Sequence, residues 1–180
     1  AWASGVDTAW VIPNEKRKDS TAVTQNLLVQ GTTLYVASAE HTNGNLTLAA
    51  YDIASDSPRQ LWVSNGGQAH TTLRYRAGQI IPYGTTLLVG NAIVDGRTGE
   101  QTQAPWENDT AMAVADNVVV TCGSAATCSG WTQESGSWRR VWTTQTGSTI
   151  GLINTWHLHG SHVVGTGAQA SFISLGSIKS

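Results

Sequence analysis

The sequence predicts an all-β protein built from short, repeated, antiparallel strands. Only 12% of its 180 residues are charged, which is about half the usual share in a globular domain. Runs rich in β-branched and aromatic residues alternate with Gly, Asn and Ser turns, and no stretch has the periodicity of an amphipathic helix. Turns at Gly31, Gly84, Asp116 and Gly160 recur at an average spacing of about 43 residues, the length of a four-stranded propeller blade.

The first segment of the chain stands apart from the repeats. Residues 1–13 contain Trp10 and end at Pro13, and we expect a strand at residues 8–12 that the proline stops. The basic run that follows, Lys16-Arg17-Lys18, is flanked by acidic residues. We therefore interpret this run as part of a solvated loop and not as a binding patch.

The next elements follow a common order. Residues 31–36 and 84–89 share the pattern Gly-Thr-Thr-Leu-x-Val, and in both copies a second apolar run, an Asp, a turn and a Trp come after it. Two weaker copies begin near Asp116 and Gly160, and the last of them has no final Trp. We therefore predict a single domain, residues 1–180, with blades at about residues 21–63, 70–107, 109–143 and 149–176.

The fourth repeat offers three strands, although a blade needs four. We expect residues 8–12 to supply its outer strand, with Trp10 in the position that a final Trp takes in the other blades. Four blades are the low end of the propeller range. The chain is therefore expected to form either a compact closed ring or half of a larger ring, which a second copy or a longer parent chain completes.

Two segments carry a family resemblance. Residues 48–52 with Leu61-Trp62, and residues 93–100 with Trp106, resemble the repeat of quinoprotein-type (PQQ-like) β-propellers. That repeat reads roughly Gly-x-Val/Leu-Tyr-x-Ala-x-Asp-x-x-Thr-Gly-x-x-x-Trp. The resemblance implies that a Trp packs between adjacent blades and that an Asp closes the turn before the outer strand. The implied structural residues are Trp10, Trp62, Trp106, Trp142, Asp52 and Asp95.

The same resemblance raises the question of a cofactor. Pyrroloquinoline-quinone dehydrogenases of this family carry adjacent cysteines over the quinone, together with calcium ligands. Here five residues separate Cys122 from Cys128, and no matching calcium cluster is identifiable. We therefore expect neither quinone nor calcium, although a quinoprotein dehydrogenase, or a fragment of one, remains the alternative to a binding module.

The two cysteines flank a turn sequence, Gly123-Ser124-Ala125-Ala126. Two strands joined there bring both sulfurs within the distance that a disulfide needs. The alternative is a pair of unreactive thiols within strands. A disulfide between Cys122 and Cys128 would indicate an oxidising compartment, hence an extracytoplasmic protein that is secreted, periplasmic or exposed on a membrane anchor.

Several polar residues are candidates for chemistry. His157, His159 and His162 could hold zinc or copper, or they could simply form a polar strand edge. Carboxylates lining a channel could act as acids or bases, but Asp52 and Asp95 occupy repeat-equivalent positions, which favours turn closure. Asp109 and Asp116 are the further carboxylates that could act in this way if they lined such a channel. The arginine pairs are interpreted as surface groups and not as anion ligands: Arg74 with Arg76, and Arg139 with Arg140.

Net charge and hydropathy argue against nucleic acid as a partner and against a membrane-spanning segment. A net charge of −2 gives no general attraction to nucleic acid, and no apolar run approaches the roughly 20 residues of a membrane span. The chain begins at Ala1 without Met, so we expect a mature or excised segment. The sequence therefore predicts a non-catalytic, extracytoplasmic module that binds a protein or a cell-surface ligand.

Overall fold

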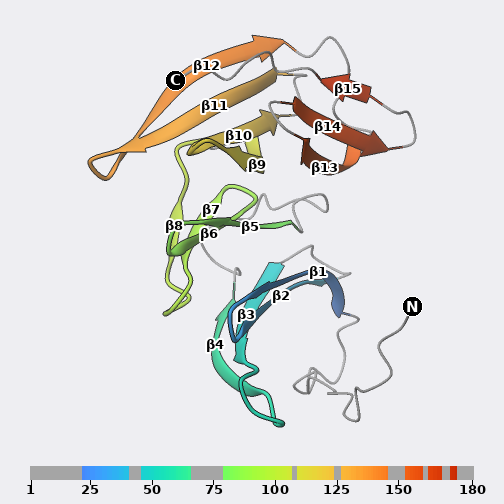
Figure 1. Cartoon of the computed structure of the whole chain (residues 1–180), viewed down its shortest axis with the longest axis vertical. Helices are drawn as coiled ribbons and strands as arrows, with labels where there is room; N and C mark the ends of the chain where they lie inside the picture. Colours follow the sequence, from blue (N-terminus) through green and yellow to red (C-terminus); the bar gives the residue numbers. More distant parts are fainter. Residues whose placement is uncertain are drawn as a thin grey trace.

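The computed structural model describes residues 22–40, 46–65, 79–106, 109–123, 127–145, 153–159, 162–167 and 171–173. Within these ranges the chain forms fifteen strands in four antiparallel sheets and no helix (Figure 1). The described part thus contains no helix with the length and hydropathy needed to cross a membrane. The predicted all-β class is confirmed.

Each sheet is a meander, in which strands that follow one another in sequence are hydrogen-bonded neighbours. The first blade comprises β1 (Ala22–Gln30), β2 (Thr33–Glu40), β3 (Leu46–Asp52) and β4 (Arg59–Asn65). The second comprises β5 (Ile80–Tyr83), β6 (Thr86–Val89), β7 (Ala92–Asp95) and β8 (Gln101–Gln103). The strands are short because turn-forming residues interrupt every apolar run.

The third blade comprises β9 (Asp109–Ala115), β10 (Val118–Gly123), β11 (Thr127–Glu134) and β12 (Ser137–Gln145). The fourth comprises β13 (Ile153–His159), β14 (His162–Gly167) and β15 (Ser171–Ile173). In the described part of the chain this last sheet therefore has three strands, whereas the others have four. The strand expected at residues 8–12, with Trp10, and Arg74 and Arg76 lie outside the described residues.

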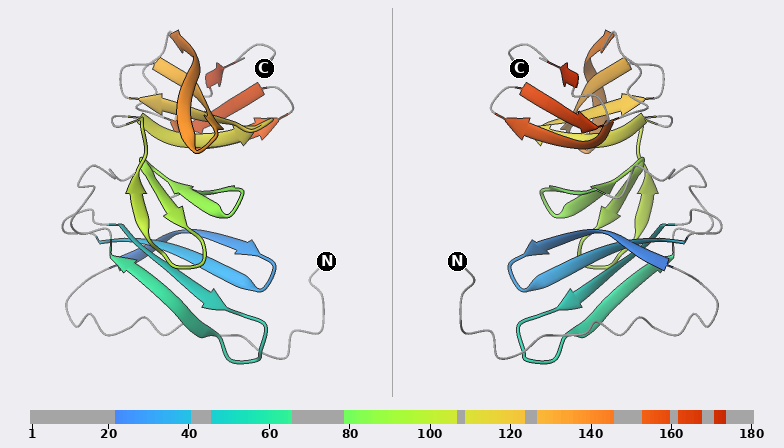
Figure 2. Two further views of the ribbon diagram at one scale, coloured as in Figure 1. Left: turned by 90° about the vertical axis from the view of Figure 1, so that its left-hand side faces the viewer. Right: turned by 90° about the vertical axis from the view of Figure 1, so that its right-hand side faces the viewer.

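The four blades are arranged in an arc. The first strands of consecutive blades contact one another, β1 with β5, β5 with β9 and β9 with β13, as in a propeller whose first strands face the axis. The first three blades follow one another along the long axis of the molecule, and the red fourth blade lies beside the third at its end (Figures 1 and 2). The first and fourth blades are thus the two ends of the arc.

The core lies between the blades. Because side chains alternate between the two faces of a strand, the second sheet contributes one apolar face to the first blade and the other to the third. Tyr35, Ala37 and Leu48 of the first blade form one cluster with Leu87 and Val89 of the second. Other residues form the next cluster, between the second and third blades: Ile81, Leu88, Ala104, Trp106, Ala111 and Val119.

Candidate functional site

The first blade has a near face, which packs against the second blade, and a far face, which points away from it. On β2 the near face holds Tyr35 and Ala37. The alternating residues Leu34 and Val36 therefore belong to the far face, where they form a separate cluster with Ala49, Tyr51 and Ile53. The far face is a candidate binding surface because it is apolar although no blade precedes it in the described part of the chain.

The strand registers show that this apolar surface crosses the whole sheet. Leu27 of β1 pairs with Val36, Val36 with Ala49, and Ala49 with Val63 of β4. Directly opposite residues share a face of a sheet. The four residues therefore form one apolar row, and a parallel row runs through Val29, Leu34 and Tyr51.

The margins of the far face are exposed. Leu27 and Val29 of β1 are 58% and 56% exposed, and Val63 of β4 is 41% exposed. Val36 and Tyr51, in the middle of the sheet, are buried at 8% each. Leu61 is 44% exposed, but it is the unpaired residue at a bulge of β4, so the register assigns it to neither face. Exposed apolar side chains gathered on one face are the usual mark of an interaction surface.

The near face is held by polar contacts as well as by apolar packing. The indole Nε1 of Trp62 and the hydroxyl of Tyr35 both donate to the carbonyl oxygen of Gly96 in the second blade, each at 3.2 Å. The Trp62 ring lies directly against Gly99, leaving no room for a β-carbon there. Burial, and secondarily the charge of Asp95, raise the pKa of the Tyr35 hydroxyl. Trp62 and Tyr35 thus join the first two blades.

Trp106 also lies between blades, but not at the position that the repeat alignment predicts. Trp62 is opposite Ala50, and Trp142 is opposite Gly130. The corresponding residue of the second blade is Thr102, opposite Ile93, so the sequence alignment of Trp106 with Trp62 and Trp142 is wrong. β8 ends at Gln103, and the connection after it supplies the indole, which bonds through Nε1 to the Gly90 carbonyl at 3.2 Å and contacts Trp131 and Trp138.

Cys122 and Cys128 form the predicted disulfide, which links paired residues of β10 and β11. Both cysteines are buried in a cluster with Met112, Ala113 and Val120, against which Trp142 packs. Val120 alternates with Val119, which faces the second blade, so the disulfide cluster lies on the opposite face of the third blade. The disulfide therefore belongs to the packing of a blade face.

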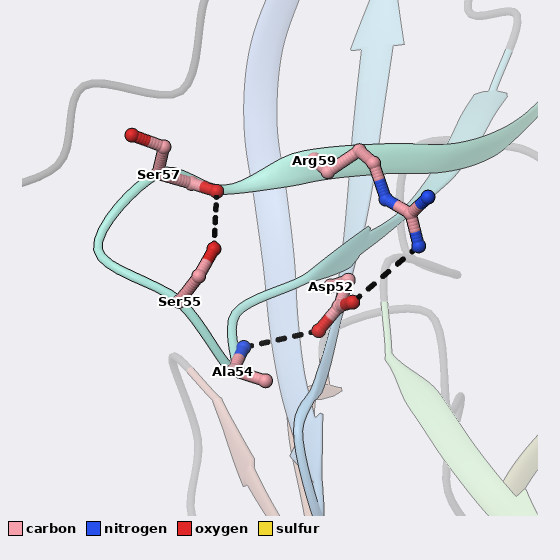
Figure 3. A network of polar contacts seen from close by, with 5 residues as sticks. All are labelled: Asp52, Ala54, Ser55, Ser57 and Arg59. Atoms are coloured by element: carbon pink, nitrogen blue, oxygen red, sulfur yellow. Dashed lines mark hydrogen bonds and ion pairs between the residues drawn. The ribbon is translucent and has the colours of Figure 1, made fainter.

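The repeated aspartates bind the turns that follow them. In the second blade, Asp95 Oδ1 accepts the backbone N–H groups of Arg97 and Thr98 at 2.8 and 2.9 Å. These two hydrogen bonds stabilise the ionised carboxylate, so they lower the pKa of Asp95. In the first blade, Asp52 Oδ1 accepts the N–H of Ala54 at 3.0 Å, and its Oδ2 lies 3.6 Å from Arg59 (Figure 3).

One carboxylate of the third blade sits in a partly buried polar cluster that the sequence did not suggest. Asp109 Oδ2 accepts the hydroxyl of Thr121 at 3.2 Å, and that hydroxyl accepts the indole N–H of Trp131 at 3.1 Å. The Arg140 guanidinium lies 5.8 Å from the centre of the Trp131 ring. Burial raises the pKa of Asp109, while Thr121 and Arg140 oppose that shift. The cluster joins all four strands of the blade.

The remaining candidates are surface groups or lie in the fourth blade. Arg139 pairs with Glu134 at 2.7 Å on the exposed end of the β11–β12 hairpin, and Asp116 is in the exposed β9–β10 turn. The backbone register pairs His159 of β13 with His162 of β14, two residues along from His157. A metal titration would distinguish the two interpretations of these three histidines, a polar strand edge and a zinc or copper site.

The chain was compared with known proteins. No protein-family model and no curated protein matches it. Among solved structures it is similar to BamB from Moraxella catarrhalis, with 12% identity and a TM-score of 0.53 over 79% of this chain and 39% of BamB. It is also similar to the computationally designed Ika4 protein, with 16% identity and a TM-score of 0.52 over 87% and 92% of the two chains.

These likenesses support the fold. BamB is a β-propeller, so the chain has a propeller-type fold. The chain spans 39% of the length of BamB, and identity at this level carries no residue role from one protein to the other.

Cys122 and Cys128 differ in arrangement from the adjacent cysteines of the quinoprotein dehydrogenases that the repeat resembles. Cys122 and Cys128 are cross-strand partners with a sequence separation of 6, and both are buried beneath Trp142 and Met112. They therefore cannot form an adjacent pair stacked over a planar ring. Among the residues whose side chains are described, no three carboxylate, His or Cys groups lie close enough to hold a metal ion.

Proposed function

We propose that the chain is a non-catalytic β-propeller module that acts outside the cytoplasm by binding a protein or cell-surface ligand through the far face of its first blade. The observation that carries the proposal is the position of the exposed apolar side chains. Among the residues whose side chains are described, five large apolar ones are exposed, and three of them, Leu27, Val29 and Val63, lie on this far face. An apolar surface of this kind favours a protein partner.

The extracytoplasmic part of the proposal rests on the disulfide. Cys122 and Cys128 form a disulfide. Disulfides persist in oxidising compartments and are rare in the cytosol. The pair is buried within a blade face, so a role in the stability of the fold fits better than a redox reaction at the surface.

Site-specific photo-crosslinking tests the binding surface. Val63 is replaced by a photoreactive phenylalanine analogue, and Val141 is the control because it is also an apolar strand residue, 37% exposed, but belongs to the third blade. The purified chain is irradiated with and without an extracytoplasmic extract of the source cells. We expect an adduct at position 63, competed by excess wild-type chain, and little at position 141. Equal labelling at both positions would contradict the proposal.

The dehydrogenase alternative has a separate test. If the chain held a quinone and calcium, adding both would stabilise the folded state by mass action and raise the unfolding temperature. We expect no shift when pyrroloquinoline quinone and calcium are added together. A rise that depends on both components would replace the binding-module proposal with the quinoprotein one.

A further inference from the structure

We propose that the far face of the first blade binds the fourth blade of a second copy of this chain, so that two arcs close one ring. This inference rests on the proposed function, since it names the partner of the same surface. It also gives the far face one occupant, a β-sheet with the geometry of a propeller blade. The argument comes from positions that are equivalent in the four blades.

The hairpins at the start of the blades provide a common numbering. Each closes on a pair of residues three apart, Gln30 with Thr33, Tyr83 with Thr86, Ala115 with Val118 and His159 with His162. Counting from these pairs makes Leu34 and Val36 of the first blade equivalent to Leu87 and Val89 of the second. The positions are thus fixed by the register of the strands as well as by the sequence.

The equivalent residues show what the far face is built to contact. Leu87 and Val89 are each 1% exposed, because the near face of the first blade covers them. The next blade repeats the relation, since Val119, equivalent to Leu87, is 0% exposed in the cluster with the second blade. Leu34 and Val36 occupy the same positions in a blade that has no predecessor in the described part of the chain. A preceding blade is therefore the surface that fits the far face.

The backbone register of the fourth blade places apolar residues at the equivalent positions. On the second strand, the residue that faces the following blade is Tyr35 in the first blade and Leu88 in the second. Val120 is the equivalent residue of the third blade and lies on the face away from the second blade. The same count gives Val164 on β14. Its partner on the third strand is Phe172, which corresponds to Ala50 and Ile93 in the first two blades. The register therefore places two apolar residues of the fourth blade at positions that elsewhere pack against the next blade.

The positions of the first and fourth blades indicate that the fourth blade that contacts the far face belongs to a second copy of the chain. The first and fourth blades end the series of contacts between blades, and in Figure 1 the first blade lies at one end of the long axis while the fourth lies beside the third near the other end. Two such arcs related by a twofold axis place each fourth blade next to the first blade of the partner. This arrangement makes two identical interfaces and leaves neither end open.

The mass of the chain in solution, measured by light scattering over a range of protein concentrations, tests the inference. We expect twice the 19.0 kDa of one chain. Val63→Asp and Leu27→Asp place a charge on the far face and should weaken the dimer at least about tenfold. Val141→Asp makes the same change in the third blade and should leave the dimer intact. A wild-type chain that stays at 19.0 kDa at every concentration overturns the inference.

Crosslinking identifies the contact and guards against misfolded variants. With the photoreactive residue at position 63 of the purified wild-type background, we expect adducts of double mass that join position 63 to residues 153–173. A crosslink within one chain would mean that its own fourth blade closes a small ring, and would overturn the inference. If the chain is monomeric but forms an adduct with a different protein in the extract, the inference of a second copy is overturned, whereas the proposed function is supported. No adduct from either sample overturns both.

Discussion

Gly99 shows how a single residue decides the contact between two blades. It lies in the turn of the second blade with a φ of 75°, a left-handed conformation that other residues adopt at a cost. Trp62 of the first blade lies directly against its Cα. The Thr-Gly of the repeat is thus required by the neighbouring indole as well as by the turn.

Gly99→Ala should therefore destabilise the protein more than the backbone conformation alone requires. The left-handed conformation costs a residue with a side chain about 1–2 kcal/mol, and the new methyl group must also displace Trp62. Gly31→Ala is the matched control, since Gly31 has a φ of 58° and nothing within 4 Å of the added carbon. Denaturant unfolding should show a larger loss for Gly99→Ala. Equal losses would mean that Trp62 moves aside without cost.

Asp109 predicts a pH dependence of stability. Burial raises its folded pKa above the ordinary value of 3.8, so ionisation costs stability at neutral pH, and that cost disappears as the pH falls through the folded pKa towards 3.8. Asp109→Asn should thus be at least as stable as the wild type at pH 7, with a difference that shrinks on acidification. A variant that is weaker than wild type at pH 7 would show that the ionised carboxylate is stabilised.

The two kinds of aspartate differ in how far the sequence reveals them. Asp52 and Asp95 act on turn residues within the next three positions, and such local hydrogen bonds follow a recognisable sequence pattern. Asp109 contacts Thr121, which lies 12 residues away on another strand. Its surroundings depend on the register of β9 with β10, which a bulge shifts between Val120 and Thr121. No local pattern encodes that shift.

At the scale of elements, the strands were predictable but the register of Trp106 was not. Alternating apolar residues and turn formers mark the strands directly, and the Cys122–Cys128 hairpin followed from its turn sequence. Trp106 follows a strand of only three residues, β8, so counting residues along the repeat assigned it to a strand position. The structure instead brings its indole in from the connection to the third blade.

Trp106→Ala should destabilise the interface between the second and third blades strongly. The side chain is 2% exposed and contacts Trp131 and Trp138, and losing a buried aromatic typically costs about 3–5 kcal/mol. Trp106→Phe keeps a ring at this position but loses the bond to the Gly90 carbonyl, which still accepts the N–H of Ala111 at 2.9 Å. We expect the phenylalanine variant to lose clearly less in thermal unfolding. An alanine variant with an unchanged midpoint would contradict the packing.

The disulfide should stabilise the folded protein only modestly, because the loop that it closes is short. Its sequence separation is 6, for which loop-closure entropy gives roughly 2 kcal/mol. Reducing the native protein should lower its unfolding midpoint. The Cys122→Ala/Cys128→Ala variant should start near the reduced value and not respond to the reductant. A variant that unfolds at the oxidised midpoint would show that the bond adds no stability.

At the scale of the whole molecule, the number of blades follows from the sequence but the closure of the ring does not. Blade number is a count of repeats, each of which has its own apolar pattern. Closure depends on small rotations between blades, which add up around the axis and which no single interface determines. The strongest indication of closure is the apolar far face of the first blade. Leu34 and Val36 occupy positions there that contact a preceding blade in the second blade, although no preceding blade is described for the first.

Closure also requires a fourth strand in the last blade. In the described part of the chain β15 pairs only with β14, so one side of β15 would offer an unpaired edge, a hazard that propellers avoid. We predict that residues 8–12 pair there, from the same chain or from a second copy. Deleting residues 1–13 should then lower the stability of the whole domain, although it removes only a terminus.

Hydrogen exchange gives the direct measurement of that pairing. Backbone amides that join a sheet exchange only when the sheet opens. The amides of residues 8–12 should therefore be protected together with those of β15 (Ser171–Ile173), and deletion of residues 1–13 should release the amides of β15. If closure takes place between two copies, protection at both segments should fall on dilution, along with the dimer. Fast exchange at residues 8–12 in the intact chain, or a truncated chain of full stability, would show that the fourth blade is completed in another way.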